Sequence, residues 1–169
     1  MQILEQGVIR ATNMPWTNRP CVCFTECVWG SLLDHAQNYS SYGLGFHKET
    51  LFKAGGGPAF YMRQDLFQAA TWPEEVFPFI TPFVPEYAPV EHRDEYWSSR
   101  APCDYTNERE WRIPHDFEFD LTEVEFITVA RYEDEAQMPT HLKDAIGRAN
   151  ILLMDNYSRV NALWPWHHY

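Results

Sequence analysis

Residues 107–113 read Asn-Glu-Arg-Glu-Trp-Arg-Ile, and this run is the most informative in the sequence because charged and apolar side chains alternate along it. Successive side chains of a β-strand point to opposite faces, so Trp111 and Ile113 together predict a buried face. Glu108, Glu110 and Arg112 would then share the other face at intervals of roughly 7 Å. The run therefore predicts a strand that presents two carboxylates and one guanidinium side by side.

This charged face has two interpretations, and the pattern alone favours neither. Carboxylates beside a guanidinium can orient a polar ligand, stabilise a developing cation or act as a general base. An exposed strand with ordinary surface ion pairs would carry the same residues. Glu26 is a second candidate, because it ends an apolar strand just before a predicted helix and so can face a pocket at the sheet edge. The alternative for Glu26 is a favourable interaction with the dipole of that helix.

The rest of the chain predicts short helices and short strands in alternation. Periodic apolar residues indicate a helix that ends at Gly7 and further helices at 28–37, 49–54, 63–71 and 139–149. Apolar or alternating runs indicate strands at 21–25, 42–47, 59–62, 108–113, 124–130 and 151–154. Together these predict an α+β fold, a compact single domain whose short-stranded mixed or antiparallel sheet is flanked by helices. Residues 72–104, rich in proline, aromatic and acidic residues, indicate an insertion within that domain.

Two groups of glycines qualify these elements. Gly43 and Gly45 lie on one face of the predicted strand 42–47, where they let a helix or a ligand approach the backbone closely. Three consecutive glycines at 55–57 could form a phosphate-binding loop, but no Gly-Lys-Ser/Thr follows them and Pro58 opens a strand. The run 55–57 is therefore expected to stop a helix and make a turn.

The chain of 169 residues has a formal net charge of −11, and the acidity is concentrated in its middle. Residues 74–135 contain 17 acidic and 5 basic side chains, whereas residues 1–62 balance acids against bases. Such a negative field disfavours a protein that coats nucleic acid non-specifically or binds an anionic membrane surface. No apolar run is long enough to span a membrane and no signal sequence is recognisable, so we expect a cytoplasmic protein.

Four cysteines, Cys21, Cys23, Cys27 and Cys103, raise the question of metal binding. Cys21 and Cys23 alternate along a strand-like run, which explains their spacing as two thiols that share one face. The paired Cys-x-x-Cys spacing of zinc sites is absent, and the seven histidines form no ligand motif. We therefore expect no metal. A hydrolase also lacks support, because no nucleophile lies in a Gly-x-Ser-x-Gly turn.

Two groups of motifs resemble the abortive-infection AbiGi family. The first comprises Pro-Cys-Val-Cys-Phe-Thr-Glu at 20–26, then His35 and Tyr39, Tyr-Gly-Leu-Gly-Phe-His-Lys-Glu at 42–49, and Pro-Ala-Phe-Tyr at 58–61. The second is Asn-Glu-Arg-Glu-Trp-Arg at 107–112, and the strand–helix–strand finish at 124–154 also resembles that family. The resemblance implies a role in phage defence, often as the antitoxin-designated partner of a two-gene system.

A second resemblance, to ADP-ribosyltransferases of the DarT type, bears on mechanism. It rests on Ile-Leu-x-x-Gly at 3–7, Phe-x-Glu at 24–26, and a late strand that carries Glu110 beside aromatic and apolar residues. The resemblance implies NAD as cofactor and Glu110 as the carboxylate at the nicotinamide ribose. Three residues would assist it: Glu108, Arg112 and Glu26. The expected ligand-binding set adds Tyr39, Tyr42 and His47, with one of the tyrosines stacked on the nicotinamide. In that family a strand bearing His or Arg precedes the helix, and here the chain begins inside the helix.

Three functional hypotheses follow. The chain could transfer ADP-ribose from NAD to a macromolecular target. It could instead be a non-catalytic antitoxin that binds a basic protein partner, a toxin or a target, through its acidic middle segment. A structural part of a larger defence assembly is the third.

Overall fold

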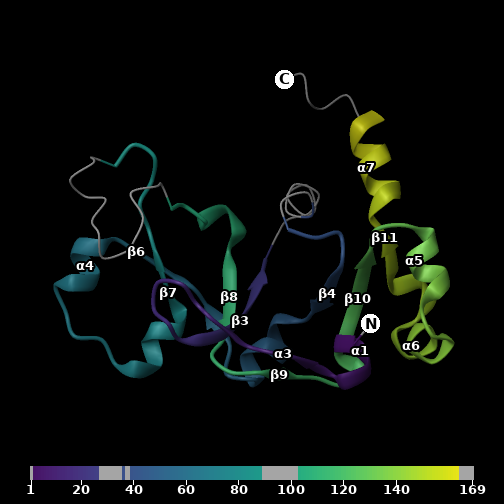
Figure 1. Ribbon diagram of the computed structural model, residues 1–169, viewed down its shortest axis with the longest axis horizontal. Helices are drawn as coiled ribbons and strands as arrows, with labels where there is room; N and C mark the ends of the chain where they lie inside the picture. The colour runs from purple at the N-terminus through teal and green to yellow at the C-terminus, as the bar shows by residue number, and fades with distance from the viewer. Residues whose placement is uncertain (1, 27–35, 37–38, 89–102, 164–169) are drawn as a thin grey trace. The chain divides into compact units, whose positions relative to one another are not determined.

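The computed structural model describes residues 2–26, 36, 39–88 and 103–163, and it consists of short helices and short strands throughout (Figure 1). The predicted α+β class, with small and mostly antiparallel sheets, is confirmed. Contacts divide the chain into two compact units, which we number in order of their first residue. The predicted helix at 28–37 lies outside the described residues, apart from residue 36. The insertion over 72–104 stays a prediction.

Unit 1, which contains Met1–Val8, Val28–Thr50 and Glu118–Tyr169, is built on a three-stranded sheet. Its strands, in sheet order, are β11 (Ile151–Leu153), β10 (Val124–Val129) and β4 (Gly43–Phe46). The central strand β10 is parallel to β11 and antiparallel to β4. On a half-exposed strand, buried and exposed residues alternate, yet the last three residues of β10 are all buried. The end of β10 forms part of the core of this unit, because β10 is the middle strand of the sheet and helices α5 (Tyr132–Gln137) and α6 (Thr140–Ile146) pack against it.

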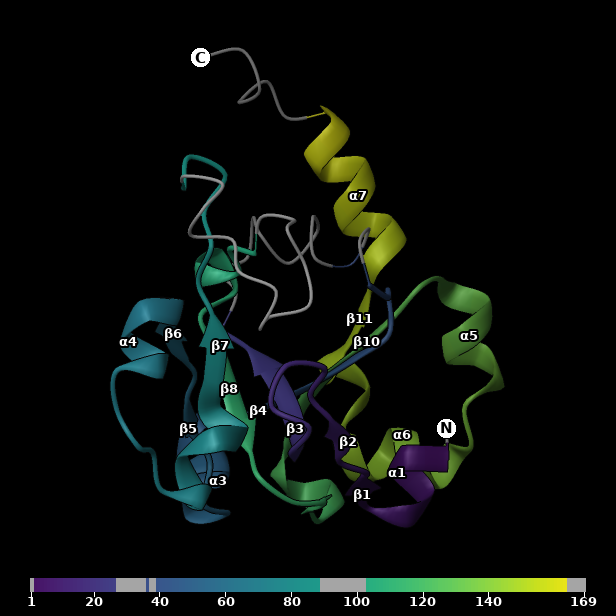
Figure 2. The same cartoon turned by 60° about the vertical axis from the view of Figure 1, so that its left-hand side comes forward.

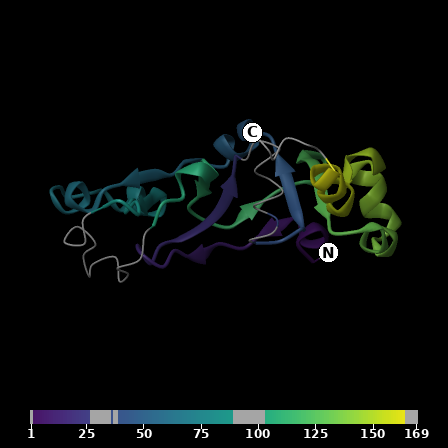
Figure 3. The same cartoon turned by 90° about the horizontal axis from the view of Figure 1, so that it is seen from above.

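Helices flank this sheet, as the sequence predicts. Among the described residues of unit 1, the helices and the 3₁₀ turns beside them include α1 (Gln2–Gln6), η5 (Leu121–Glu123), α5 (Tyr132–Gln137), α6 (Thr140–Ile146), η6 (Arg148–Asn150) and α7 (Met154–Leu163). Helices α5 and α6 lie on the same side of β10 and β11, visible in green in Figures 1 and 3. Leu142 and Ile146 are four residues apart on α6, so both face the sheet and both are buried. Helix α1 ends as expected at Gly7, whose φ of +61° is left-handed.

The glycines of β4 are approached by side chains of the neighbouring strand β10. A Cβ at position 45 would stand 2.2 Å from the ring of Phe126, and a Cβ at position 43 would stand 2.9 Å from Oγ1 of Thr128. The close approach expected at Gly43 and Gly45 is therefore confirmed, and what approaches is β10. The pairing of these two strands carries an irregularity between Val124 and Phe126.

Unit 2, which contains Ile9–Cys27 and Leu51–Phe117, holds a four-stranded sheet in which neighbouring strands are antiparallel. The strands, in sheet order, are β2 (Thr12–Asn13), β3 (Pro20–Thr25), β8 (Glu110–Ile113) and β5 (Gly57–Pro58). Strands β3 and β8 pair from Val22 opposite Ile113 to Thr25 opposite Glu110. The two runs that carry the strongest sequence patterns are thus neighbours.

A second layer of unit 2 comes from residues 60–82, which lead into the proline- and aromatic-rich part of the chain. Its elements are β6 (Phe60–Met62), α4 (Gln64–Gln68), the 3₁₀ helix η1 (Glu74–Phe79) and β7 (Ile80–Pro82). Strands β6 and β7 run side by side and parallel, with α4 next to them (Figure 2). Phe67 and the fully buried Ile80 form a hydrophobic cluster there. Helix α4 is shorter than the predicted 63–71.

The remaining elements are short. Strands β1 (Val8–Ile9) and β9 (Phe117–Glu118) and helix α3 (Lys48–Lys53) lie where the chain passes from one unit to the other. Helix α3 stops as predicted at the glycine run, because Gly55 is left-handed and the Gly56 N–H donates to the Leu51 carbonyl at 2.8 Å. The glycine run at 55–57 is therefore a helix stop and a turn.

Strand β8 begins two residues later than predicted. Glu108 ends a 3₁₀ turn, η4 (Thr106–Glu108), and Arg109 is left-handed at φ +48°. A residue in that conformation breaks the alternation of side chains, so Glu108 does not lie on a strand face beside Glu110. The prediction of three charged residues in one row is wrong for Glu108 and is met by Glu110 and Arg112 alone.

Candidate functional site

The charged pair on β8 is buried rather than presented to a ligand. Arg112 has no exposed surface, and Glu110 is 9% exposed. The guanidinium and the carboxylate form a two-point ion pair, in which Nε donates to Oε1 at 3.0 Å and Nη2 donates to Oε2 at 2.7 Å. Two-point geometry is the strongest form of this interaction, and it fixes both planes.

Arg112 uses its remaining donors on the layer formed by η1 and β7. Nη1 donates to the carbonyl oxygens of Pro78 at 3.0 Å and Ile80 at 2.8 Å, and Nη2 donates to Oγ1 of Thr81 at 2.5 Å. A guanidinium has five N–H donors, and all five are therefore satisfied within the protein. Arg112 has no donor left with which to bind a phosphate or carboxylate ligand.

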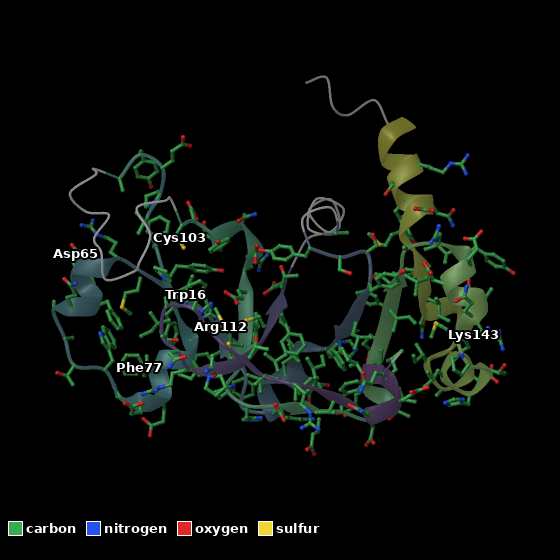
Figure 4. The ribbon with its side chains drawn as sticks, in the orientation of Figure 1. Trp16, Asp65, Phe77, Cys103, Arg112 and Lys143 are labelled. Carbon is green, nitrogen blue, oxygen red and sulfur yellow. The ribbon has the colours of Figure 1, made fainter. Side chains whose placement is uncertain are left out.

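Trp16 completes this arrangement from the loop between β2 and β3. The guanidinium carbon of Arg112 lies 5.5 Å from the ring centroid of Trp16, within the range of a cation–π interaction. The Trp16 indole N–H donates to the Ile80 carbonyl at 2.7 Å, so the same oxygen accepts from both residues. Figure 4 shows Trp16 beside Arg112. Arg112 thus joins three segments that are distant in the sequence.

The electrostatics agree with a charged pair. Burial alone would lower the pKa of Arg112, but the hydrogen bonds and charge of Glu110 outweigh it and raise that pKa above the ordinary value. Breaking one partner of such a pair leaves an uncompensated buried charge. The geometry therefore favours a structural role for Arg112, and the catalytic roles expected for Glu110 and Arg112 stay predictions. The sequence did not predict that Trp16 and Thr81 contact Arg112. Both contacts depend on how the segment 74–82 lies against β8, and no sequence pattern indicates which way the carbonyls of that segment point.

Glu26 and Glu108 lie at the end of the β3–β8 pair. The Glu26 carboxylate accepts from Nη2 of Arg109 at 2.5 Å, and the Glu26 N–H donates to the Glu108 carbonyl at 3.2 Å. Thr25 Oγ1 donates to that same carbonyl at 2.7 Å. Both candidates are thus gathered around the left-handed Arg109, which directly precedes Glu110 in the chain.

Sulfur atoms gather on β3 itself, on the face that Cys23 shares with Arg112 of the neighbouring strand. Cys21 Sγ and Cys23 Sγ are 3.6 Å apart, which confirms that the two thiols share one face, and Cys23 Sγ lies 3.7 Å from Met14 Sδ. The hydrogen bond between the thiols lowers the pKa of Cys21 and raises that of Cys23. Cys27 lies outside the described residues. Among the described residues, no three His, Cys, Asp or Glu side chains lie together as metal ligands.

Three of the expected ligand-binding residues belong to unit 1. His47 Nε2 lies 3.0 Å from Oε1 of Glu125 on β10. A hydrogen bond with Asp134 is the main cause that raises the pKa of Tyr42, a side chain that is 58% exposed. Tyr39 is 61% exposed. Because Glu110 belongs to unit 2, a shared pocket of these residues with Glu110 stays a prediction.

Tyr42 and His47 both meet an acidic stretch of unit 1. We call residues 118–135 the acidic segment: it contains seven acidic side chains and one basic side chain, Arg131. Its acids are Glu118, Asp120, Glu123, Glu125, Glu133, Asp134 and Glu135. Glu123 and Asp134 cap their own helices, whereas Glu118, Glu125 and Glu133 are exposed. Tyr132, in the middle of this segment, is 65% exposed.

No helix in the described part of the chain is long and apolar enough to cross a membrane. Residues 6–77 match the family model described as "Putative abortive phage resistance protein AbiGi, antitoxin". The match contains β3, β4 and α3, so the resemblance to that family is confirmed for the first group of motifs. The second group, at 107–112, lies beyond the matched residues. No curated protein and no solved structure matches the chain.

Proposed function

We propose that this chain is a phage-defence protein of the antitoxin type, which binds a partner protein with a basic surface. The family match at 6–77 supports the defence role and the antitoxin type. The acidic segment supports the mode of binding and is the observation on which the proposal rests. An antitoxin of this type would act in the cytoplasm, beside its partner.

Charge is the property that distinguishes the acidic segment from the rest of the described chain. Seven acids against one base within 18 residues give a local negative field, and the ion pairs of Glu125 and Asp134 neutralise little of it. Within the segment, Arg131 pairs with Asp134 at 3.8 Å and His47 meets Glu125. Such a field speeds the encounter with a basic protein and disfavours acidic competitors.

Exposed tyrosines add aromatic binding surface to the negative charge of the acidic segment. Tyr132 lies within the acidic segment, on α5. Tyr42 interacts with Asp134, which also lies on α5. Tyrosine is enriched at the positions that contribute most to protein–protein binding, and its ring also attracts Arg and Lys side chains. An Arg-rich or Lys-rich partner surface therefore fits both features.

The test is a charge reversal in the acidic segment. The partner to be tested first is the protein encoded next to this chain's gene, and the dissociation constant of its complex with the purified chain is measured by calorimetry. Changing Glu125→Lys and Glu133→Lys together should raise the dissociation constant by about tenfold, since each contact of this kind contributes up to about 1 kcal/mol.

Glu5→Lys is the matched control. Glu5 is exposed on α1 of the same unit and lies outside the acidic segment, so the change in net charge per site is the same. This variant should keep the wild-type dissociation constant to within about twofold. Weakening by Glu5→Lys that is as large per reversed charge as that of the double variant would show that net charge alone acts. That result, or unchanged binding of the double variant, would overturn the proposal.

ADP-ribose transfer from NAD is the alternative to this proposal, and it rests on the sequence resemblance alone. Glu110 would have to reach the nicotinamide ribose, but both of its oxygens accept from the buried Arg112. We therefore expect Glu110→Gln and the wild-type chain to show the same background NAD turnover when nicotinamide release is measured. Turnover by the wild type that Glu110→Gln removes, while the variant keeps its near-ultraviolet circular dichroism, would favour the transferase instead.

A further inference from the structure

Three sulfur atoms form a cluster in unit 2 that the proposed function does not use. Cys23 Sγ lies at its centre, 3.6 Å from Cys21 Sγ and 3.7 Å from Met14 Sδ. Cys21 is 2% exposed and Met14 is 9% exposed, whereas Cys23 reaches the surface. The cluster is therefore mostly enclosed but can be entered from the side of Cys23.

The β2–β3 hairpin holds these residues in place. Thr12 pairs with Cys21 and Asn13 with Pro20, and the Met14 N–H donates to the Arg19 carbonyl at 2.9 Å. Two residues apart on β3, the cysteines point to the same face because side chains alternate along a strand. The cluster is thus built by ordered backbone pairing rather than by a chance meeting of long side chains.

The spacing of the sulfurs suits a shared ligand better than a disulfide. A disulfide needs the two sulfurs about 2.05 Å apart, so Cys21 and Cys23 would have to close by roughly 1.5 Å along one strand. Three sulfurs around a metal ion with bonds of about 2.3 Å lie roughly 4 Å from one another. The two separations that involve Cys23, 3.6 Å to Cys21 Sγ and 3.7 Å to Met14 Sδ, differ from that value by only a few tenths of an ångström.

We propose that Met14, Cys21 and Cys23 form a binding site for one copper(I) ion. Thiolate and thioether sulfurs are soft ligands that select copper(I), and a thioether is a poor ligand for zinc. On binding, the two thiols release their protons to solvent and the copper stays in the +1 state. The ion with two thiolates carries one net negative charge. The Arg112 guanidinium acts on Cys21 as a compensating charge, and the Glu110 carboxylate paired with Arg112 acts in the opposite direction.

The test is a competition titration with copper(I) itself. The purified, fully reduced chain is mixed under nitrogen with the coloured copper(I)–bicinchoninate complex, with ascorbate present to keep the copper reduced. We expect the chain to remove one equivalent of copper per molecule. The double variant Cys21→Ser, Cys23→Ser should remove none, and Met14→Leu should weaken binding by at least about tenfold, since even an outer-shell change costs that much.

Cys103→Ser is the matched control, because Cys103 is also a free thiol of unit 2 but pairs with the Pro82 carbonyl instead of another sulfur. This variant should keep the wild-type stoichiometry. X-ray absorption should show three sulfur neighbours for the wild type and two for Met14→Leu. Three results would each overturn the proposal. They are a wild-type chain that keeps its circular dichroism but takes up no copper, copper uptake that persists in the double cysteine variant, and an affinity for zinc(II) equal to that for copper(I). None of these readouts depends on partner binding.

Discussion

Arg112 shows how a fully buried charge is stabilised in a small unit. Its five donors reach a carboxylate, two backbone carbonyls and a hydroxyl, and an indole ring covers one face. The alternation at 107–113 correctly predicted a strand with Glu110 and Arg112 on one face. It could not predict that this face is buried, because the acceptors at 78–81 are mostly backbone atoms that any sequence possesses.

At the residue scale, the first prediction concerns Arg112. Replacing Arg112→Met should lower the free energy of unfolding by about 3–5 kcal/mol, because Glu110 is left buried without a counter-charge. The measurement is urea unfolding followed by tryptophan fluorescence.

Two further variants give this prediction its control. Arg112→Met together with Glu110→Leu should recover part of the loss, since an apolar pair of similar volume can replace a buried ion pair. Arg148→Ala removes an exposed pair with Asp144 and should change stability by less than about 1 kcal/mol. A loss from Arg112→Met as small as that from Arg148→Ala would contradict the structural role.

Secondary structure was more predictable than the contacts between elements. The strands at 21–25, 42–47, 124–130 and 151–154 are present because apolar runs bounded by turn residues carry that information locally. The start of β8 was missed, since the left-handed Arg109 has no local sequence signal. Helices α5 and α7 were also missed.

At the element scale, the glycines of β4 offer a sharp prediction. Gly45→Ala should lower the free energy of unfolding by about 1–3 kcal/mol, because the new methyl group would displace the Phe126 ring that now lies over the backbone. Thermal and urea unfolding measure this directly.

Gly57→Ala is the matched control on a strand of the other unit. There the added methyl group would meet the Phe79 ring at an ordinary 3.7 Å, and φ is not left-handed. Its stability should stay within about 0.5 kcal/mol of the wild type. A Gly45→Ala chain as stable as Gly57→Ala would mean that Phe126 does not lie on Gly45.

For the whole molecule, charge is distributed unevenly in a way that composition conceals. The net charge of −11 belongs largely to residues 74–135, and in the described structure the dense part of that stretch, the acidic segment, lies on η5, β10 and α5 of unit 1. The sequence alone shows that the acidic residues are concentrated at 74–135. It could not show that Tyr42 and His47, some 80 residues earlier, meet Asp134 and Glu125, because that depends on the pairing of β4 with β10.

If this acidic segment binds a basic partner protein, the stability of their complex must depend on the salt concentration. Attraction between exposed charges is screened at higher ionic strength, so the dissociation constant should rise at least about tenfold between 50 and 300 mM sodium chloride. The chain with Glu125→Lys and Glu133→Lys should show a clearly shallower dependence. A dissociation constant that does not change with salt, or the same steep dependence in both chains, would contradict the account.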